Sequence, residues 1–461
     1  MQFDPQLAEI RFGCGLSPVI APPVSVAQML DSLNAPDTIA ERFPVETFEI
    51  FQNRVAEAVR LRKLRRTNRG SPEALAALKG RRMLNQQARI AQVAWLGQHF
   101  NRWTWTTAPL RERLVHFWAD HFTATGKAGV ARRAATPYIE SAIRPRVAGL
   151  FEDLLLATVL HPLMIHYLDQ EQSIGPASPR ALQGGKVSGL NENLAREVLE
   201  LHTLGVGGPY TQTDVTQLAE LLTGVTTGDP MRMRFRKDMA EPGAETVLGI
   251  AYGSGKARLR DVEAVLRDLA RHPATARHLA GKLAVHFISD TPDPALVEGL
   301  AARYMETGGD LGAVTAALLE HPAAWPPARV NVKQGFRFMA SAFRALALPP
   351  KTLAALDEKT ARRLLVIPLA QMGHAWEKPA GPDGLPEEDS AWIAPQSIAA
   401  RLQWAIAVPQ RLLPALPDPR DFVGQALGDA IPPAVQFAAD AAESRGDGIG
   451  LILASPAFQR T

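Results

Sequence analysis

Two segments place acidic, basic and imidazole side chains at spacings that a helix would bring together. In the segment Asn193–Leu204, polar residues stand at positions i, i+3, i+4 and i+7, namely Asn193, Arg196, Glu197 and Glu200. Successive helical residues turn by about 100°, so these four share one stripe and His202 points nearly opposite to Asn193. Apolar residues cover most of the remaining circumference. We therefore expect an enclosed helix in which Glu197 and Glu200 are buried and paired.

A second stripe occurs in Leu110–Phe122 and consists of Glu112, Arg113, His116 and Asp120. If the two helices face each other, Arg113 is a candidate partner for the carboxylates. Carboxylate and imidazole groups together suit a divalent metal ion, and the candidate ligands are His116, Asp120, His121, Glu197 and Glu200. Helical bundles use a Glu-x-x-His spacing for such sites, whereas this chain has Glu197-x-x-Glu200. The alternative is a solvated stripe with an Arg196–Glu200 ion pair.

Complete catalytic signatures are absent from the sequence. It has no GxSxG elbow, no HExxH, no phosphate-binding loop and no GxGxxG after a strand. Lys282 and His286 share one helix face, which is typical of an ordinary helix surface, with a general base as the alternative. Two functions stay open. The first is a non-catalytic binding or assembly protein that acts with a partner, and the second is a metal-assisted enzyme that uses a buried Glu/His/Asp cluster between two helices.

Charge is nearly balanced over the chain. The 461 residues include 50 basic and 47 acidic side chains, for a net charge of +3. A nucleic-acid-binding protein normally concentrates its basic residues in one stripe, and the best candidate here is Arg60–Arg82. We interpret this segment as a solvated helix face, with a polyanion site as the alternative, and expect no nucleic-acid partner.

Three observations bear on the compartment. Cys14 is the single cysteine, which excludes an intramolecular disulfide and a cysteine-based zinc site. No run of about 18 apolar residues occurs, so we expect no membrane span. The N-terminus lacks a basic region followed by an apolar core, which favours a cytoplasmic location.

Helical periodicity dominates the sequence, and 46% of the residues are hydrophobic, enough for a sizeable core. We predict an all-α fold, a large multi-helical globular unit over residues 1–461, with a subdivision near residue 255 as the alternative. At most one small β-hairpin is expected, pairing Met231–Arg236 with Thr246–Tyr252.

His-Pro pairs follow apolar helical runs, and we predict that their histidines, His161, His272 and His321, sit at helix junctions. Two segments rich in Gly and Pro, Gln172–Gly189 and Lys378–Glu388, are expected to be irregular. Segments of this kind inside a compact protein are often functional.

Four segments resemble the bacterial DUF1800 family. They are RFGCGLSP at residues 11–18, LRERLVHFWADHFT at 110–123, NENLAREVLELHTLGVGGPYTQTDVT at 191–216, and the run from Arg271 to Leu311. The ending LASPAFQ at 453–459 is also similar. One departure is Ala119-Asp120, where the family's FWHNHF motif has a histidine.

The resemblance implies a mostly helical fold whose biochemical activity is not established. It also implies a protein partner encoded nearby, from a sulfatase-like family, and export of many relatives. A periplasmic location is therefore the alternative to the cytoplasmic one.

Overall fold

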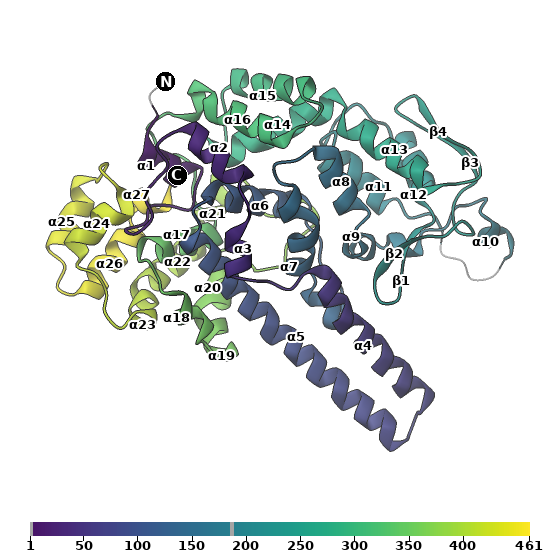
Figure 1. Ribbon diagram of the computed structural model, residues 1–461, viewed down its shortest axis with the longest axis horizontal. Coiled ribbons are helices and arrows are strands. Elements are labelled where there is room, and N and C mark those ends of the chain that lie inside the picture. The colour runs from purple at the N-terminus through teal and green to yellow at the C-terminus, as the bar shows by residue number, and fades with distance from the viewer. Residues whose placement is uncertain (1–2, 185–188) are drawn as a thin grey trace.

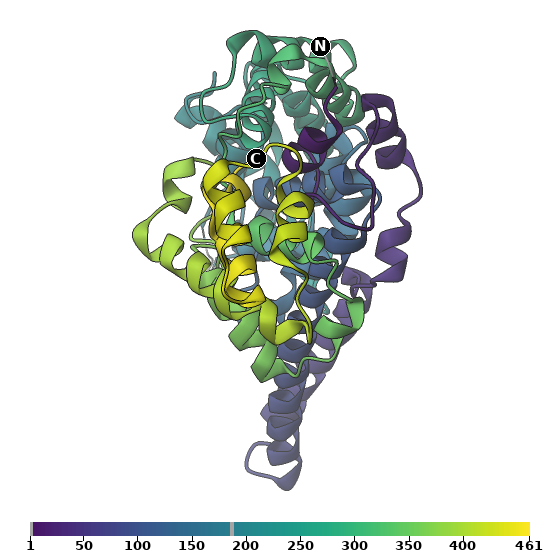
Figure 2. The ribbon, with the colours of Figure 1, turned by 90° about the vertical axis from the view of Figure 1, so that its left-hand side faces the viewer.

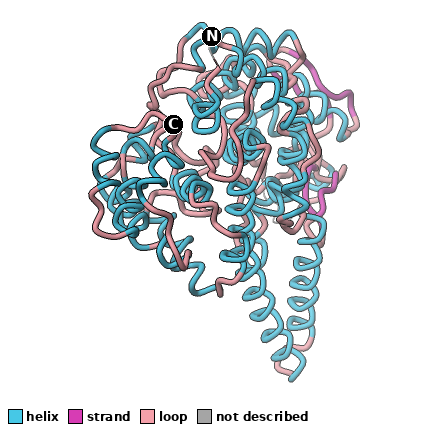
Figure 3. The backbone as a smooth tube through the Cα atoms, turned by 60° about the vertical axis from the view of Figure 1, so that its left-hand side comes forward, coloured by secondary structure: helices cyan, strands magenta, loops and turns pink. Residues whose placement is uncertain are grey.

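The computed structural model describes residues 3–184 and 189–461. Helices make up 62% of it, about twice the share in an average globular domain. The prediction of a large, all-α unit is therefore confirmed (Figure 3). Among the described residues, no helix is both long enough and apolar enough to cross a membrane.

The first part of the chain contains α1 (Pro5–Arg11), α2 (Val26–Asn34), α3 (Thr38–Arg42), α4 (Phe48–Thr67), α5 (Pro72–Trp105) and α6 (Pro109–His121). Among the described residues, α5 with 34 residues and α4 with 20 are the longest helices. α4 packs against α5 in a hairpin that projects from the body (Figures 1 and 2). Ser71 starts α5 because its side chain accepts the N–H of Ala74, and Pro72 occupies a first-turn position that needs no donor. We call residues 57–87, the projecting part, the arm.

Short helices fill the middle of the chain: η1 (Gly129–Arg133), α7 (Ala135–Tyr138), η2 (Ile139–Ile143), η3 (Arg144–Arg146), α8 (Phe151–Val159), α9 (Pro162–Tyr167), η4 (Gln170–Gln172), α10 (Pro179–Leu182), α11 (Asn193–Glu197), η5 (Val198–His202) and α12 (Gln212–Leu222). The helix expected over Asn193–Leu204 is α11, continued by the π-helix η5. The segment expected to be irregular at Gln172–Gly189 contains α10, and its residues 185–188 lie outside the described ranges.

The strands form two hairpins in place of the one expected. β1 (Val225–Gly228) pairs with β2 (Arg232–Phe235), and β3 (Gly243–Val247) pairs with β4 (Ile250–Gly255), both antiparallel. The expected pairing of Met231–Arg236 with Thr246–Tyr252 is wrong, because each strand pairs with its nearest neighbour across a short turn. Glu241-Pro242 leads from one hairpin to the other instead of turning within one.

The remaining helices are α13 (Leu259–Ala270), α14 (Pro273–Phe287), α15 (Pro294–Glu306), α16 (Leu311–Glu320), η6 (Pro322–Ala324), α17 (Gly335–Ala345), α18 (Pro350–Ala354), α19 (Glu358–Ala361), η7 (Arg362–Val366), α20 (Ile367–Gln371), α21 (Asp389–Trp392), α22 (Pro395–Ala407), α23 (Pro409–Leu412), α24 (Pro419–Leu427), α25 (Pro433–Asp440), α26 (Arg445–Ala454) and α27 (Pro456–Gln459). The three junction histidines are confirmed as N-caps of α9, α14 and η6. Their Nδ1 atoms accept backbone N–H groups two residues on, at 3.1 Å for His161, 3.0 Å for His272 and 3.2 Å for His321.

Two hydrophobic clusters make up the core. The first draws on residues from Leu7 to Trp325, and the second combines Cys14 and part of α5 with residues from Phe336 to Phe458. α5 belongs to both, since Trp95 packs in the first cluster and Phe100 in the second. This helix therefore runs from the tip of the arm to the centre of the molecule.

Candidate functional site

The stripe on α11 and η5 is less enclosed than expected. Glu197 and Glu200 are half-buried rather than buried, and Asn193 is exposed. Glu200 is paired, because its Oε1 lies 3.2 Å from Arg196 Nη1. For Glu197, the structure shows no hydrogen bond within the described residues, and burial followed by the nearby Glu200 carboxylate raises its pKa to about 7. The apolar side of the helix, with His202, faces the core instead.

The expected partners on α6 point elsewhere. Arg113 Nη1 donates to the carbonyl of Arg11 at 2.7 Å, and its guanidinium lies over the Phe287 ring at 4.9 Å. It therefore does not pair with Glu197 or Glu200. His116 Nε2 lies 2.8 Å from Gln334 Oε1.

The side chains expected to bind a divalent metal ion come from α6, α11 and η5. In residues 3–184 and 189–461, no group of three or more His, Cys, Asp or Glu side chains is arranged to hold a metal ion. The proposed ligands were His116, Asp120, His121, Glu197 and Glu200. The physical reason is that α6 approaches η5 through His121 and His202, not through the two polar stripes.

A different group of polar side chains does converge, where α6, η5, α14 and the segment 378–388 meet. We call it the polar cluster: Asp120, His121, His202, His278, Lys282, His286 and Glu387. α14 supplies His278, Lys282 and His286 at positions i, i+4 and i+8, which lie on one helix face. The ring centroid of His121 lies 6.0 Å from that of His202 and 6.2 Å from that of His278.

Two buried imidazoles of the cluster are neutral. His121 Nε2 lies 3.2 Å from the His202 carbonyl oxygen, and because a carbonyl only accepts, Nε2 carries the proton. Burial lowers the pKa of His121, and it lowers the pKa of His202 to about 3, with Lys282 adding to both effects. Neither ring nitrogen of His202 has a partner among the described residues, nor does Nδ1 of His121.

His286 and Glu387 form an oriented pair. Nδ1 of His286 lies 2.9 Å from Oε2 and 3.0 Å from Oε1 of the carboxylate. Burial lowers the pKa of His286 to about 4 despite Glu387. Burial acts to raise the pKa of Glu387, but His286 and then Lys282 outweigh it and the pKa falls. A neutral imidazole therefore donates from Nδ1 to an ionised carboxylate, which leaves a lone pair on Nε2.

The pKa of Asp120 is shifted in the opposite direction from that of Glu387, toward the protonated form. Burial, and after it the Glu387 carboxylate, raises the pKa of Asp120 to about 8. Its Oδ1 accepts the N–H of Leu385 at 2.9 Å. Gly384 has φ +81°, and an added Cβ would lie 2.7 Å from Oδ1, so glycine is required for this close approach. A mostly protonated carboxyl can donate a hydrogen bond at neutral pH.

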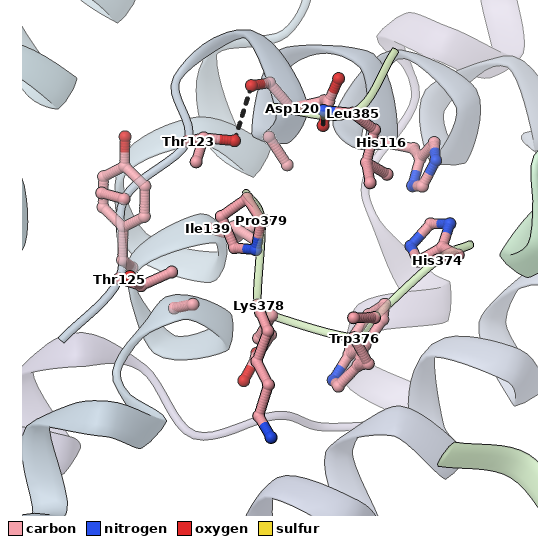
Figure 4. A pocket seen from close by; sticks show the side chains of 16 residues that line it. His116, Asp120, Thr123, Thr125, Ile139, His374, Trp376, Lys378, Pro379 and Leu385 are labelled. Carbon is pink, nitrogen blue, oxygen red and sulfur yellow. Dashed lines mark hydrogen bonds between the residues drawn. The ribbon is translucent and has the colours of Figure 1, made fainter. Parts of the chain in front are cut away.

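A cavity of about 100 Å³ lies beside Asp120, between α6, α7, η2 and residues 374–385 (Figure 4). His116, His374 and Trp376 lie on one side, and Thr125 lies across from them. The ring centroids of His116 and His374 are 5.8 Å apart. Burial lowers the pKa of His374 to about 3 and raises that of Glu377. His374 and His116 are therefore uncharged at neutral pH.

One protein family matches most of the chain. The family model described as "Protein of unknown function (DUF1800)" matches residues 10–460. The chain belongs to this family. No curated protein and no solved structure matches it.

Three of the four segments that carry the DUF1800 resemblance build the polar cluster. Residues 110–123 form α6, residues 191–216 contain η5, and the run from Arg271 supplies α14. Sequence reasoning identified Asp120, His121 and His202, and it named the i, i+4 pair Lys282 and His286. The residues it missed include His278, His374, Trp376 and Glu387. The available signal for Glu387 was the Gly- and Pro-rich segment Lys378–Glu388.

The arm is a second candidate site because its charge differs from that of the body. Residues 57–87 carry two acidic residues and nine basic ones: Arg60, Arg62, Lys63, Arg65, Arg66, Arg69, Lys79, Arg81 and Arg82. The net charge of the arm is therefore +7. Because the net charge of the whole chain is +3, that of the remaining residues is −4. All the basic side chains except the half-buried Arg81 are exposed, which confirms a solvated face. Within the described residues, only Arg60 forms an ion pair, with Glu57 at 2.7 Å.

Proposed function

We propose that this DUF1800 protein is a non-catalytic binding protein that assembles with a partner protein, and that the arm is its docking element. The observation that carries the proposal is the projecting hairpin. α5 has 34 residues and thus a length of about 51 Å at 1.5 Å per residue. Its outer half adds little to either hydrophobic cluster, and its charges stay solvated. The sulfatase-like family implied for relatives is the first partner to test.

The experiment is co-purification from native cells with a full-length arm and with a shortened one. Leu61 and Gly80 lie opposite each other, since an added Cβ on Gly80 would meet the Leu61 side chain at 3.3 Å. Removing residues 62–79 and joining the ends with a short glycine-serine turn therefore shortens the hairpin without removing a residue of either hydrophobic cluster.

We expect a stoichiometric partner with the full-length protein and none with the shortened one. Equal melting temperatures would show that the body of the shortened protein is intact. A partner that stays bound to the shortened protein, or a wild type that is purified without any partner, would contradict the proposal.

An acid–base enzyme is the second candidate, and the observation that favours it is Asp120 at the cavity. A protonated Asp120 would act as general acid, and Lys282 and the His286–Glu387 pair would set its protonation. The metal-assisted form has less support, because the candidate ligands do not converge. The test compares wild type and Asp120→Asn on ester, phosphoester and glycoside model substrates. Turnover that Asp120→Asn abolishes would favour the enzyme, and no turnover by the wild type would disfavour it.

For the compartment, we propose the cytoplasm, with the periplasm as the alternative. Fractionation of native cells distinguishes the two, and the fraction that contains the co-purifying partner gives an independent check.

A further inference from the structure

The outer face of α5 carries a stripe of mixed apolar and cationic side chains. Its members are Leu75, Lys79, Arg82, Met83, Gln86 and Ile90, at positions i, i+4, i+7, i+8, i+11 and i+15. This spacing places them on one side of a helix. Leu75 is 63% exposed, Met83 60% and Ile90 45%. We call this set the α5 stripe.

The α5 stripe points away from the rest of the arm. Leu61 of α4 and Ala74 and Ala77 of α5 are buried in the hairpin interface, so the inner face of α5 is already occupied. Three large apolar side chains on the outer face are then left in solvent, eight and seven residues apart. Apolar residues that recur about every two turns match the repeat by which one helix packs along another.

The charge of the arm specifies what kind of helix fits. Lys79 and Arg82 lie between the apolar residues, and neither has an ion-pair partner among the described residues. The net charge of +7 on the arm favours an acidic partner. A duplex nucleic acid would use the cations but not Leu75, Met83 and Ile90. A helix bound to a membrane surface separates a continuous apolar face from its cationic face, whereas here Lys79 and Arg82 lie among the apolar residues.

We propose that the α5 stripe binds an acidic amphipathic helix of the partner protein. This inference rests on the proposed docking role of the arm and specifies its chemistry. Apolar side chains of the partner helix pack on Leu75, Met83 and Ile90, while its carboxylates pair with Lys79 and Arg82. Both contributions are needed, because an exposed ion pair alone contributes little to affinity.

The test uses a fluorescent synthetic helix about four heptads long, with Leu at the a and d positions and Glu at e and g. The full-length protein is titrated into it, and anisotropy gives the affinity. We expect the wild type to bind. The double variant Leu75→Ser with Met83→Ser should bind at least about tenfold more weakly, and so should Lys79→Glu with Arg82→Glu.

A matched control reverses the charge of two exposed lysines in the β-hairpin region, Lys237→Glu with Lys256→Glu. It makes the same change in net charge at a distance from the arm, so it should leave the affinity unchanged. All variants should melt at the wild-type temperature, because the replaced side chains are exposed.

Duplex DNA and phosphatidylserine vesicles are titrated in parallel. No binding of the peptide by the wild type overturns the proposal. So does tighter binding of DNA or vesicles that is unaffected by the two serines. The native partner separates this inference from the docking role itself. If the shortened arm loses that partner but both stripe variants keep it, the arm docks and the α5 stripe does not.

Discussion

His286 Nδ1 lies 2.9 Å from Glu387 Oε2, and this contact joins α14 to the segment that closes over Asp120. Glu387→Ala would leave a buried imidazole N–H without an acceptor. A lost partner of this kind costs about 1–3 kcal/mol, so we expect a lower free energy of unfolding by that amount. Chemical denaturation measures it. Glu387→Gln keeps an acceptor oxygen and should lose less, and an alanine variant as stable as wild type would show that the pair does not hold the segment.

The Asp120 carboxyl should make the free energy of unfolding decrease as pH rises. Its pKa is raised from 3.8 to about 8, so between these values the unfolded chain loses a proton that the folded chain keeps. The contribution to stability is complete below about pH 4 and is lost as pH rises toward 8, by at most about 1.4 kcal/mol per pH unit. Glu387, Asp383 and Lys282 are the charged groups that face it.

The variant that checks this dependence is Asp120→Asn, which mimics the protonated carboxyl and can still accept from Leu385. We expect its stability relative to wild type to increase steadily from pH 5 to pH 8. A difference that does not change with pH would place the Asp120 carboxyl in a solvated, ordinary environment.

Glu197 and Glu200 should respond differently to removal of their charges. The pKa of Glu197 is raised from 4.5 to about 7. The free energy of unfolding therefore decreases as pH rises between these values, because the unfolded chain releases this proton first. Glu197→Gln should therefore be at least as stable as wild type at pH 8. Glu200→Gln loses the ion pair with Arg196, which at this partial exposure is worth about 0–1 kcal/mol. Thermal melts at pH 5 and pH 8 check both, and a large loss for Glu197→Gln at pH 8 would indicate a buried partner.

Local signals in the sequence predicted local structure well. Each His-Pro pair marks a helix start capped by the histidine ring, because capping involves only neighbouring residues. The opposite orientations of Asn193 and His202 also followed from helix periodicity: the first is exposed and the second buried.

Long-range relationships were not available from periodicity. His286 and Glu387 are 101 residues apart, and the loop that carries Glu387 has no repeating pattern to place it. Apolar residues flank the stripe on α11 in the sequence, and this pattern predicted a buried stripe. Burial of the stripe, however, requires another helix to pack against that side of α11, and periodicity does not show this. η5 turns His202, rather than Glu200, toward α6. Likewise, the residue pattern of Met231–Arg236 does not specify its partner, which is the nearer strand β1.

The histidine caps provide a clean test of a local prediction. His272 Nδ1 accepts the N–H of Ala274 at 3.0 Å at the start of α14. His272→Ala removes this acceptor and should cost about 0.5–2 kcal/mol, the usual effect of losing an N-cap. His272→Asn offers a side-chain oxygen at the same place and should recover most of the loss. If alanine and asparagine are equally destabilising in urea denaturation, the ring acts through packing and not through the cap.

We propose that residues 1–461 unfold as one unit, without a subdivision near residue 255. The two hydrophobic clusters share α5, and Arg344 of α17 ties them further by donating to the carbonyl groups of Gly15, at 2.8 Å, and Thr106, at 3.0 Å. A single calorimetric transition is the expected result. Phe100→Ala, at a fully buried position, should shift that whole transition, for a loss of about 3–5 kcal/mol. Phe437→Ala is the control, because Phe437 is 72% exposed and should have little effect. Two transitions, of which Phe100→Ala moves only one, would show that the clusters unfold separately.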